Sequence, residues 1–218
     1  MFDLEAFITT FAPAFKDIAA GSAALVAVYV ASRGLQTWNR QLRGTSQYEL
    51  ARRLLRATYR LRDAIDGVRH PVMWGAEMPD PPEDRAANMN RDELRHWGVR
   101  QAYGKRWDAL AKERSELQAE LLEAEVLWGP DVKDLFKPLQ ELQGELFVAV
   151  ENHLEATDPR QGEDHRAVYD GIIRERRQVL YDRSDNDGPD PFRAQLLAAV
   201  KAIEDYCRQY LDLDVRKK

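Results

Sequence analysis

Apolar residues recur at helical spacing along most of the chain, and the longest repeat lies between Arg91 and Leu127. There, steps of four and three residues alternate and form a heptad stripe, which predicts a long amphipathic helix. Its members are Tyr103, Trp107, Leu110, Arg114, Leu117, Leu121, Ala124 and Trp128. Arg114 interrupts the apolar series, so it sets the register, pairs with a buried carboxylate, or faces solvent on a slightly rotated seam. Gly129 and Pro130 predict the end of this helix and the start of the next.

Shorter apolar repeats predict four more helices after residue 45. The first opens at Ser46-Gln47-Tyr48-Glu49, which has the S-x-x-E form of a capping box, and it ends before Pro71. The alternative is that this helix continues from the N-terminal segment, with Gly44 as a flexible point. Another follows over residues 135–154, where Pro138 marks a kink or a delayed start. The last two carry their apolar residues within 168–180 and 192–210. No segment alternates like a strand, so residues 45–218 are predicted to form an antiparallel bundle of four to five helices.

Two connections in this bundle differ in character. Residues 70–90 contain four prolines and no sustained periodicity, which predicts an irregular excursion longer than most loops. Its apolar side chains Met73, Trp74 and Met78 are expected to pack on the bundle, with contact to a partner as the alternative. Residues 184–190 are rich in Asp, Asn and Gly, and a solvated loop is expected there.

The N-terminal part of the chain contains fifteen residues without a charge, from Ile18 to Ser32. As a helix this run spans about 22 Å, and flanking Lys16 and Arg33 can reach the headgroups of a hydrocarbon core roughly 30 Å thick. The predicted fold class is therefore all-α, with a single transmembrane helix in residues 1–44, followed by the bundle. The alternative is a buried helix of a soluble bundle, because hydropathy alone does not separate the two for a run of this length. A cleaved signal peptide fits poorly, since the basic residues follow the apolar run.

Charge is distributed unevenly around this run. Residues 33–69 hold nine arginines against three carboxylates, although the whole chain has a net charge of −5. Under the positive-inside rule these arginines keep the bundle on the cytoplasmic side of a bacterial inner membrane and leave the N-terminus on the outer side. The candidate contacts for anionic lipid or phosphate are Arg33, Arg40, Arg43, Arg52, Arg53, Arg56 and Arg60. Lipid is the simpler partner, nucleic acid is disfavoured because no reader motif is present, and pairing with acidic residues of the same bundle is the alternative.

Small residues recur every fourth position in the apolar run, at Ala19, Ala23, Ala27 and Ala31. Small-xxx-small ridges allow membrane helices to approach closely. This pattern predicts a homo-oligomer or packing against a helix of a membrane protein partner, and simple alanine abundance is the other explanation.

The spacing patterns that mark common catalytic and metal-binding sites are missing from the sequence. The four histidines are scattered and share no ligand spacing with the single cysteine, Cys207, so no metal or cofactor site is expected. No nucleophile elbow and no glycine-rich phosphate loop are present. The chain is therefore expected to be an interaction or scaffold protein without catalytic activity.

Two resemblances add expectations of their own. Arg91 and His96 stand in an R-x-x-x-x-H pattern that resembles the motif of HEPN-type ribonucleases. That resemblance implies metal-independent RNA cleavage in which Arg91 stabilises phosphate charge and His96 moves a proton. Three stretches, Trp38 to Gly44, Glu49 to Arg53 and Glu123 to Gly129, are similar to uncharacterised bacterial proteins that have an N-terminal membrane segment and a cytoplasmic helical domain. This second resemblance implies topology and fold, and it assigns no activity.

Overall fold

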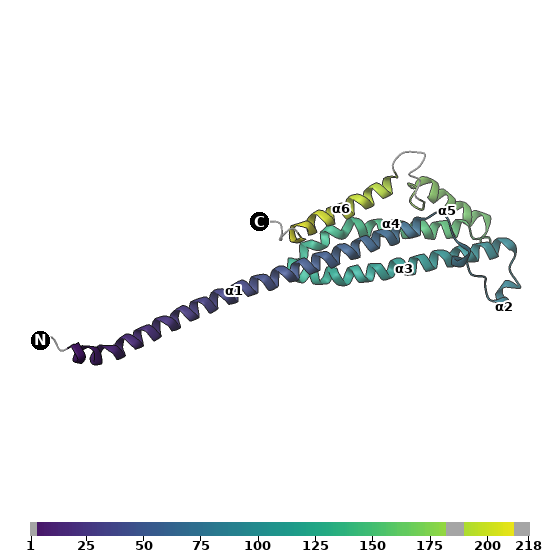
Figure 1. Ribbon diagram of the computed structural model, residues 1–218. Coiled ribbons are helices and arrows are strands. Elements are labelled where there is room, and N and C mark those ends of the chain that lie inside the picture. The colour runs from purple at the N-terminus through teal and green to yellow at the C-terminus, as the bar shows by residue number, and fades with distance from the viewer. Residues whose placement is uncertain (1–3, 182–189, 212–218) are drawn as a thin grey trace. The chain divides into compact units, whose positions relative to one another are not determined.

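The computed structural model describes residues 4–181 and 190–211, with side chains from Tyr29 onward except at residue 39 (Figure 1). The described part holds helices and irregular segments and no strand, which confirms the all-α prediction. In chain order the elements are α1 (Leu4–Arg69), η1 (Gly75–Glu77), α2 (Glu83–Ala86), α3 (Arg91–Trp128), η2 (Pro130–Phe136), α4 (Lys137–Ala156), α5 (Glu163–Glu175) and α6 (Pro191–Leu211). The chain divides into two compact units, Met1–Gln47 and Tyr48–Lys218. The predicted boundary between anchor and bundle lies between residues 44 and 45.

No helix starts at Ser46, because α1 already includes the preceding residues, so the continuous alternative is the correct one. An S-x-x-E pattern caps a helix only where the chain before it has left helical geometry. Here the upstream residues keep that geometry, and the hydroxyls of Thr37 and Thr45 donate to the carbonyls of Arg33 and Gln41 four residues earlier, both at 3.0 Å. At the other end, α1 stops at Arg69 before Pro71, as predicted.

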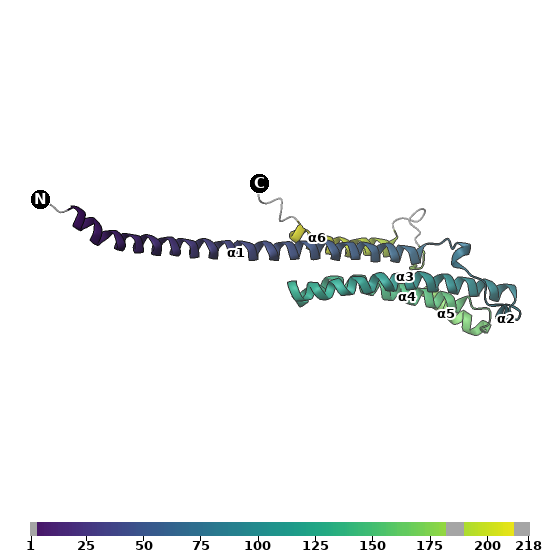
Figure 2. The same ribbon diagram turned by 60° about the horizontal axis from the view of Figure 1, so that its bottom comes forward.

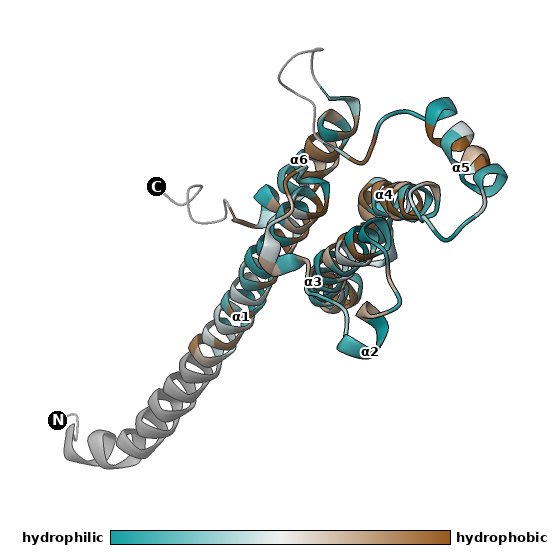
Figure 3. Ribbon diagram, turned by 90° about the vertical axis from the view of Figure 1, so that its right-hand side faces the viewer, coloured by the Kyte–Doolittle hydropathy of each residue, from teal (hydrophilic) through white to brown (hydrophobic). Residues whose placement is uncertain are grey.

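The bundle unit has one continuous apolar core that draws on the C-terminal part of α1 and on α3, α4 and α6. Most of the predicted heptad positions of α3 are buried, while Arg114 is exposed, which favours the rotated-seam explanation. α4 packs against both α5 and α6, and Figure 2 shows α5 beside α4. Apolar and polar residues share each of these helices, brown beside teal in Figure 3, as expected when only one face is buried. The largest fully buried apolar side chains are Phe136, Phe192, Leu50, Leu54, Leu61, Ile65, Leu110, Leu121, Leu139, Leu146 and Leu196.

Helix ends follow the local chemistry of the sequence. Asn90 caps α3 by accepting hydrogen bonds from the backbone N–H groups of Asp92 and Glu93, and the Glu93 carboxylate accepts from the N–H of Asn90 in return. Gly129 ends α3 with φ of 98°, in the region that glycine tolerates best. α4 starts only at Lys137, so the delayed start at Pro138 is confirmed and the preceding residues form η2.

Two neighbouring basic residues of α3 bind the excursion over residues 70–90, and Lys105 donates to the carbonyl of Ala76 at 3.1 Å. Arg106 donates to the carboxylate of Glu77 at 2.6 Å and to the carbonyls of His70 and Val72, both at 2.7 Å. Met78 packs so closely on α3 that a Cβ added at Gly98 would lie 3.1 Å from its own Cβ. Met73 also packs against the core, whereas Trp74 is exposed, so the packing expectation holds for the two methionines.

Two expectations for the C-terminal third are wrong. Val179 and Leu180 lie beyond the end of α5 at Glu175, yet they are buried in the core as part of an irregular segment. Asp190, expected in a solvated loop, is buried because it pairs with Arg69, and the rest of that loop lies outside the described residues. Arg69 also donates to the carbonyl of Val179 at 2.7 Å, so one buried guanidinium joins the end of α1, this irregular segment and the start of α6.

Candidate functional site

The arginines of the bundle part of α1 face carboxylates of α3. Arg53 donates through Nε to Glu120 at 2.9 Å and through Nη2 to Glu123. Arg60 donates to Glu116 at 2.9 Å. From Arg53 to Arg60 the chain advances along α1, whereas the glutamates that they contact lie progressively earlier in α3. The two helices therefore run antiparallel where these ion pairs form. Two of the seven candidate arginines therefore pair with the acidic face of the same bundle, which is the alternative that the sequence left open.

These ion pairs also affect the charge state. The hydrogen bonds that Arg53 donates to Glu120 and Glu123 are the main reason that its pKa is raised, so this side chain keeps its positive charge. Pairs exposed to this degree add little to stability, typically about 0–1 kcal/mol, because solvent screens them. Arg53 and Arg60 direct their charge toward α3, which leaves less of it available for an outside anion.

The other five candidate arginines are exposed and do not pair with α3. Arg52 forms an exposed pair with Glu49 at 3.2 Å on its own helix, and the Arg33 guanidinium lies 5.4 Å from the ring centre of Tyr29. Exposed Arg40, Arg43 and Arg56 form no ion pair with a carboxylate in the part of the chain that the structure describes. Among the described side chains of the N-terminal unit, the arginines that can meet an external anion are therefore Arg33, Arg40 and Arg43.

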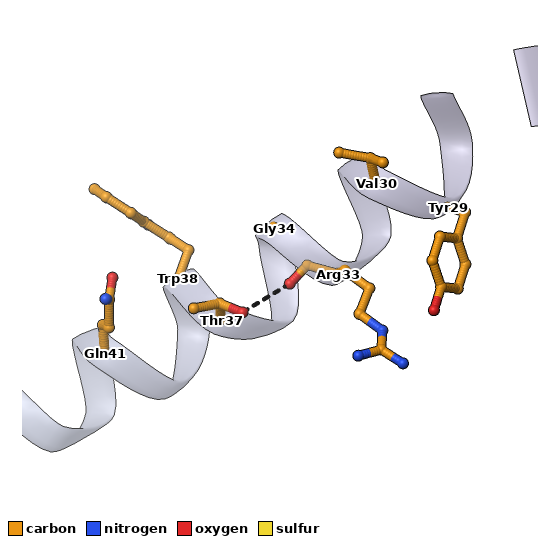
Figure 4. A pocket seen from close by; sticks show the side chains of 7 residues that line it. All are labelled: Tyr29, Val30, Arg33, Gly34, Thr37, Trp38 and Gln41. Atoms are coloured by element: carbon orange, nitrogen blue, oxygen red, sulfur yellow. Dashed lines mark hydrogen bonds between the residues drawn. The ribbon is translucent and has the colours of Figure 1, made fainter. Parts of the chain in front are cut away.

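The same unit exposes an apolar stripe, which we call the α1 seam. It consists of Ala31, Leu35, Trp38, Leu42 and Thr45. Its three large members are 63%, 60% and 53% exposed. Figure 4 shows Val30 and Trp38 pointing to one side of the helix and Arg33 to the other, with Gly34 leaving a shallow recess between Val30 and Trp38.

Most of the predicted membrane-packing ridge lies outside the residues whose side chains are described. This applies to Ala19, Ala23 and Ala27, whereas Ala31 is described and exposed. Among the residues searched, no helix is long and apolar enough to cross a bilayer. The membrane segment thus remains a prediction from the sequence.

A second group of polar residues surrounds a cavity of about 160 Å³ between α4, α5 and residues 176–181. His153 lies at its wall and forms T-shaped ring contacts with Tyr103, at a centroid distance of 6.1 Å, and with Tyr181 at 6.3 Å. Arg177, also on the wall, donates through Nε to Glu145 at 2.6 Å, so its charge is already paired. The cavity therefore combines a partly buried imidazole with two aromatic rings, and the arginine beside it is paired.

Burial determines the electrostatics of this cluster. Burial is the main cause of the lowered pKa of His153, and the charge of His96 lowers it further. The pKa of His96 is also lowered, chiefly by burial, although the Asp158 carboxylate at 3.9 Å favours its protonated form. Burial raises the pKa of the Tyr103 hydroxyl. All three groups are neutral near pH 7.

The two residues of the HEPN-like pattern do not face a common site. Arg91 is exposed in the first turn of α3, while His96 is largely buried beside Asp158. Residues five positions apart on a helix point about 140° from each other, so one chain does not bring the two side chains together. Neutral, enclosed His96 lacks the access to substrate that proton transfer to RNA requires.

Metal and thiol chemistry find no support in the described residues either. No group of three His, Cys, Asp or Glu side chains there could hold a metal ion. Cys207 is fully buried, and burial raises its pKa to about 12, so it is an inert core thiol.

Comparisons of the chain with protein-family models, with curated protein sequences and with solved structures find no match. The resemblances to bacterial membrane-anchored proteins and to HEPN-type ribonucleases therefore stay predictions. Any assignment of function depends on the geometry described above.

Sequence reasoning missed three arginines that organise the bundle: Arg69, Arg106 and Arg177. Each bonds to groups more than 15 residues away in the chain. A weak signal for Arg69 was its place at the end of an apolar helical face, next to Val68. The partners of all three lie in irregular segments or on other helices, and no local pattern identifies them.

Proposed function

We propose that this chain is a single-pass membrane protein whose helical bundle serves as a non-catalytic interaction module. Residues 18–32 form the membrane segment within α1, and residues 1–44 act as the anchor with its juxtamembrane part. The bundle, an antiparallel assembly of four to five helices, lies on the cytoplasmic side of a bacterial inner membrane. The N-terminus lies on the opposite side.

The observation that carries this proposal is that the described end of the apolar run, residues 29–32, is exposed and belongs to no part of the core cluster. Within the described part, every member of the core cluster lies at or beyond Leu50. The described side chains from Tyr29 to Arg43 are exposed. Contiguous apolar surface that a fold leaves unused is unfavourable in water. A lipid environment for residues 18–32 removes that cost.

The arginines that follow the run support the proposed orientation. Arg33, Arg40 and Arg43 are exposed and pair with no carboxylate in the described part of the chain. A basic side chain near an anionic membrane surface gains about 1 kcal/mol. Basic residues within 15–20 positions of a membrane segment are also those that decide its orientation.

The alternatives find less support in the geometry. The proposed phosphate stripe on the bundle includes Arg53 and Arg60, which are committed to α3, and Arg52, which pairs with Glu49. The ribonuclease pair is split between an exposed arginine and an enclosed histidine. An anchored interaction module accounts for the apolar run and for the arginines without requiring either activity.

Alkaline extraction of cell membranes tests the proposal with a matched pair of full-length variants. One variant carries Leu25→Asp and Val28→Asp in the apolar run, where each aspartate costs about 2.5–3.5 kcal/mol at the centre of a membrane helix. The control carries Leu122→Asp and Val126→Asp, which replace two exposed side chains of α3. We expect the wild-type protein and the control to stay in the membrane pellet and the first variant to be released. Release of the wild-type protein would refute the anchor.

A further inference from the structure

The α1 seam has the geometry of a coiled-coil interface. Its five residues follow one another by alternating steps of four and three, so Leu35 and Leu42 occupy a positions and Ala31, Trp38 and Thr45 occupy d positions of a heptad. All five are exposed, and the large side chains at positions 35, 38 and 42 are each more than half exposed. An isolated helix is marginal in water and gains most of its stability when an apolar face is packed. The seam therefore needs a covering partner.

The residues around the seam point to the identity of that partner. In the sequence, its flanking e and g positions hold Ser32, Gly34, Asn39, Gln41 and Ser46, none of which is charged. The three arginines of this segment, Arg33, Arg40 and Arg43, occupy b and f positions on the outer side. Figure 4 shows this separation for Arg33 and Trp38.

This pattern suits pairing between identical chains. In a parallel two-stranded coiled coil, the g residues of one helix face the e residues of the other, and charges there select the partner. Identical helices with arginine at those positions would repel each other, whereas uncharged flanks allow self-pairing. We infer that the α1 seam binds the α1 seam of a second copy of this chain in a parallel coiled coil.

Gly34 adds a steric argument. It occupies a g position beside Leu35 and contributes to the hole that receives Leu35 of the second copy. A Cβ built at Gly34 meets nothing within 4 Å, so no contact within the described part of the chain requires a glycine there. The recess between Val30 and Trp38 leaves room for an approaching helix.

The parallel orientation rests on the proposed function, because two copies anchored in one membrane with the same topology present their helices side by side in the same direction. Ala31 is also the last member of the small-residue ridge, so the seam begins where that ridge ends. Two heptads form a short interface, and confinement to a membrane raises the effective concentration of the two helices.

Cysteine cross-linking of the full-length protein in isolated membranes tests this inference. Single cysteines are placed in the seam as Leu35→Cys, Trp38→Cys and Leu42→Cys, and on the outer side as Arg33→Cys, Gln36→Cys, Arg40→Cys and Arg43→Cys. Native Cys207 stays in place, because it is fully buried, and the wild-type protein measures its background. After mild oxidation we expect several-fold more disulfide-linked dimer from the three seam positions than from the four outer ones. A flat profile, a maximum at the outer positions, or no dimer at all would overturn the inference.

A second variant and a fractionation step keep the outcomes distinct. In the Leu42→Cys protein, adding Leu35→Glu should lower the dimer yield several-fold, whereas adding Gln36→Glu on the outer side should leave it unchanged. Equal yields would contradict the seam. Each sample is also divided into membrane and soluble fractions. Seam-specific cross-links in a soluble protein would support the coiled coil and refute the membrane anchor. A membrane-bound protein without such cross-links would support the anchor and refute the coiled coil.

Discussion

Arg69 and Asp190 form an ion pair in the core of the bundle, with 0% and 4% of their side chains exposed. The pair joins the end of α1 to the start of α6, and the Asp190 carboxylate also accepts a hydrogen bond from the backbone N–H of Phe192 at 2.9 Å. The guanidinium lies 4.4 Å from the ring centre of Phe192. One carboxylate thus neutralises a buried charge and caps a helix.

Replacing Asp190 should destabilise the bundle more than any change to an exposed pair. Asp190→Asn keeps an acceptor for the helix cap but leaves Arg69 as an unpaired buried charge, and such losses cost about 3–5 kcal/mol. Asp190→Ala also removes the cap, which adds roughly 1 kcal/mol. Urea unfolding followed by circular dichroism measures both effects. The control is Asp205→Asn in the exposed Lys201–Asp205 pair, where we expect less than about 1 kcal/mol. Equal losses at the two sites would show that the buried pair has no special role.

Two glycines of α3 should respond in opposite directions to alanine. At Gly98 the new methyl group would lie 3.1 Å from the Met78 Cβ, and overpacking of this kind costs about 1–3 kcal/mol. At exposed Gly104 a Cβ meets nothing within 4 Å, so alanine should stabilise the helix by about 0.5–1 kcal/mol.

The location of the effect at Gly98 can be measured as well. Gly98→Ala should loosen the excursion over residues 70–90 and increase its cleavage by proteases, and Gly104→Ala should not. If both variants were stabilised, the close packing of Met78 on α3 would be incorrect.

Acid should weaken the bundle through two partly buried histidines, His96 and His153. Burial lowers the pKa of His153 and of His96 from the usual 6.5, so the unfolded chain binds protons more readily than the folded one as the pH falls through that value. The contribution of these histidines to the free energy of unfolding is therefore fully present above about pH 6.5 and is lost as the pH falls below that value. Urea midpoints at pH 7.5 and 5.5 measure this loss, and His153→Gln should reduce it. The control is exposed His70→Gln, which should leave the loss unchanged. A wild-type midpoint that does not fall at pH 5.5 would contradict the prediction.

The exposed arginines of the N-terminal unit, and not those paired with α3, should control the orientation of the protein in the membrane. Replacing Arg33, Arg40 and Arg43 by Gln removes the basic residues nearest the apolar run, and we expect a fraction of the chains to insert in the inverted orientation. Arg53→Gln together with Arg60→Gln should leave the orientation unchanged, because both side chains pair with α3. Protease protection in inverted vesicles measures the two variants side by side. A larger effect from Arg53 and Arg60 would exclude this division of roles.

The helices could be predicted because their signals are local. The four-and-three spacing from Tyr103 to Trp128 depends only on the geometry of one helix, and Gly129 and Pro130 end it by backbone chemistry. Ser46 shows the limit of such signals, since its capping pattern carries no information on whether the chain before it is already helical. Val179 and Leu180 are buried without being helical, which periodicity does not detect.

The candidate sites were less accessible to sequence reasoning. The charge of residues 33–69 was visible, but the division between open Arg40 and paired Arg53 depends on α3 carboxylates about 70 positions away. Arg69 and Asp190 are 121 positions apart. The cavity beside His153 is closed by residues from two helices and an irregular segment. Such sites arise only when the fold brings distant segments together.

The most direct test of the anchored topology is labelling of single cysteines with a membrane-impermeant maleimide. Cys207 contributes little background, because it is fully buried and burial raises its pKa to about 12. Asp3→Cys reports on the N-terminus, and Ser115→Cys reports on an exposed position of α3. In intact spheroplasts the account predicts labelling at position 3 and none at position 115, with both positions labelled after lysis. Protection of both positions in intact spheroplasts, or labelling of position 115 alone, would contradict it.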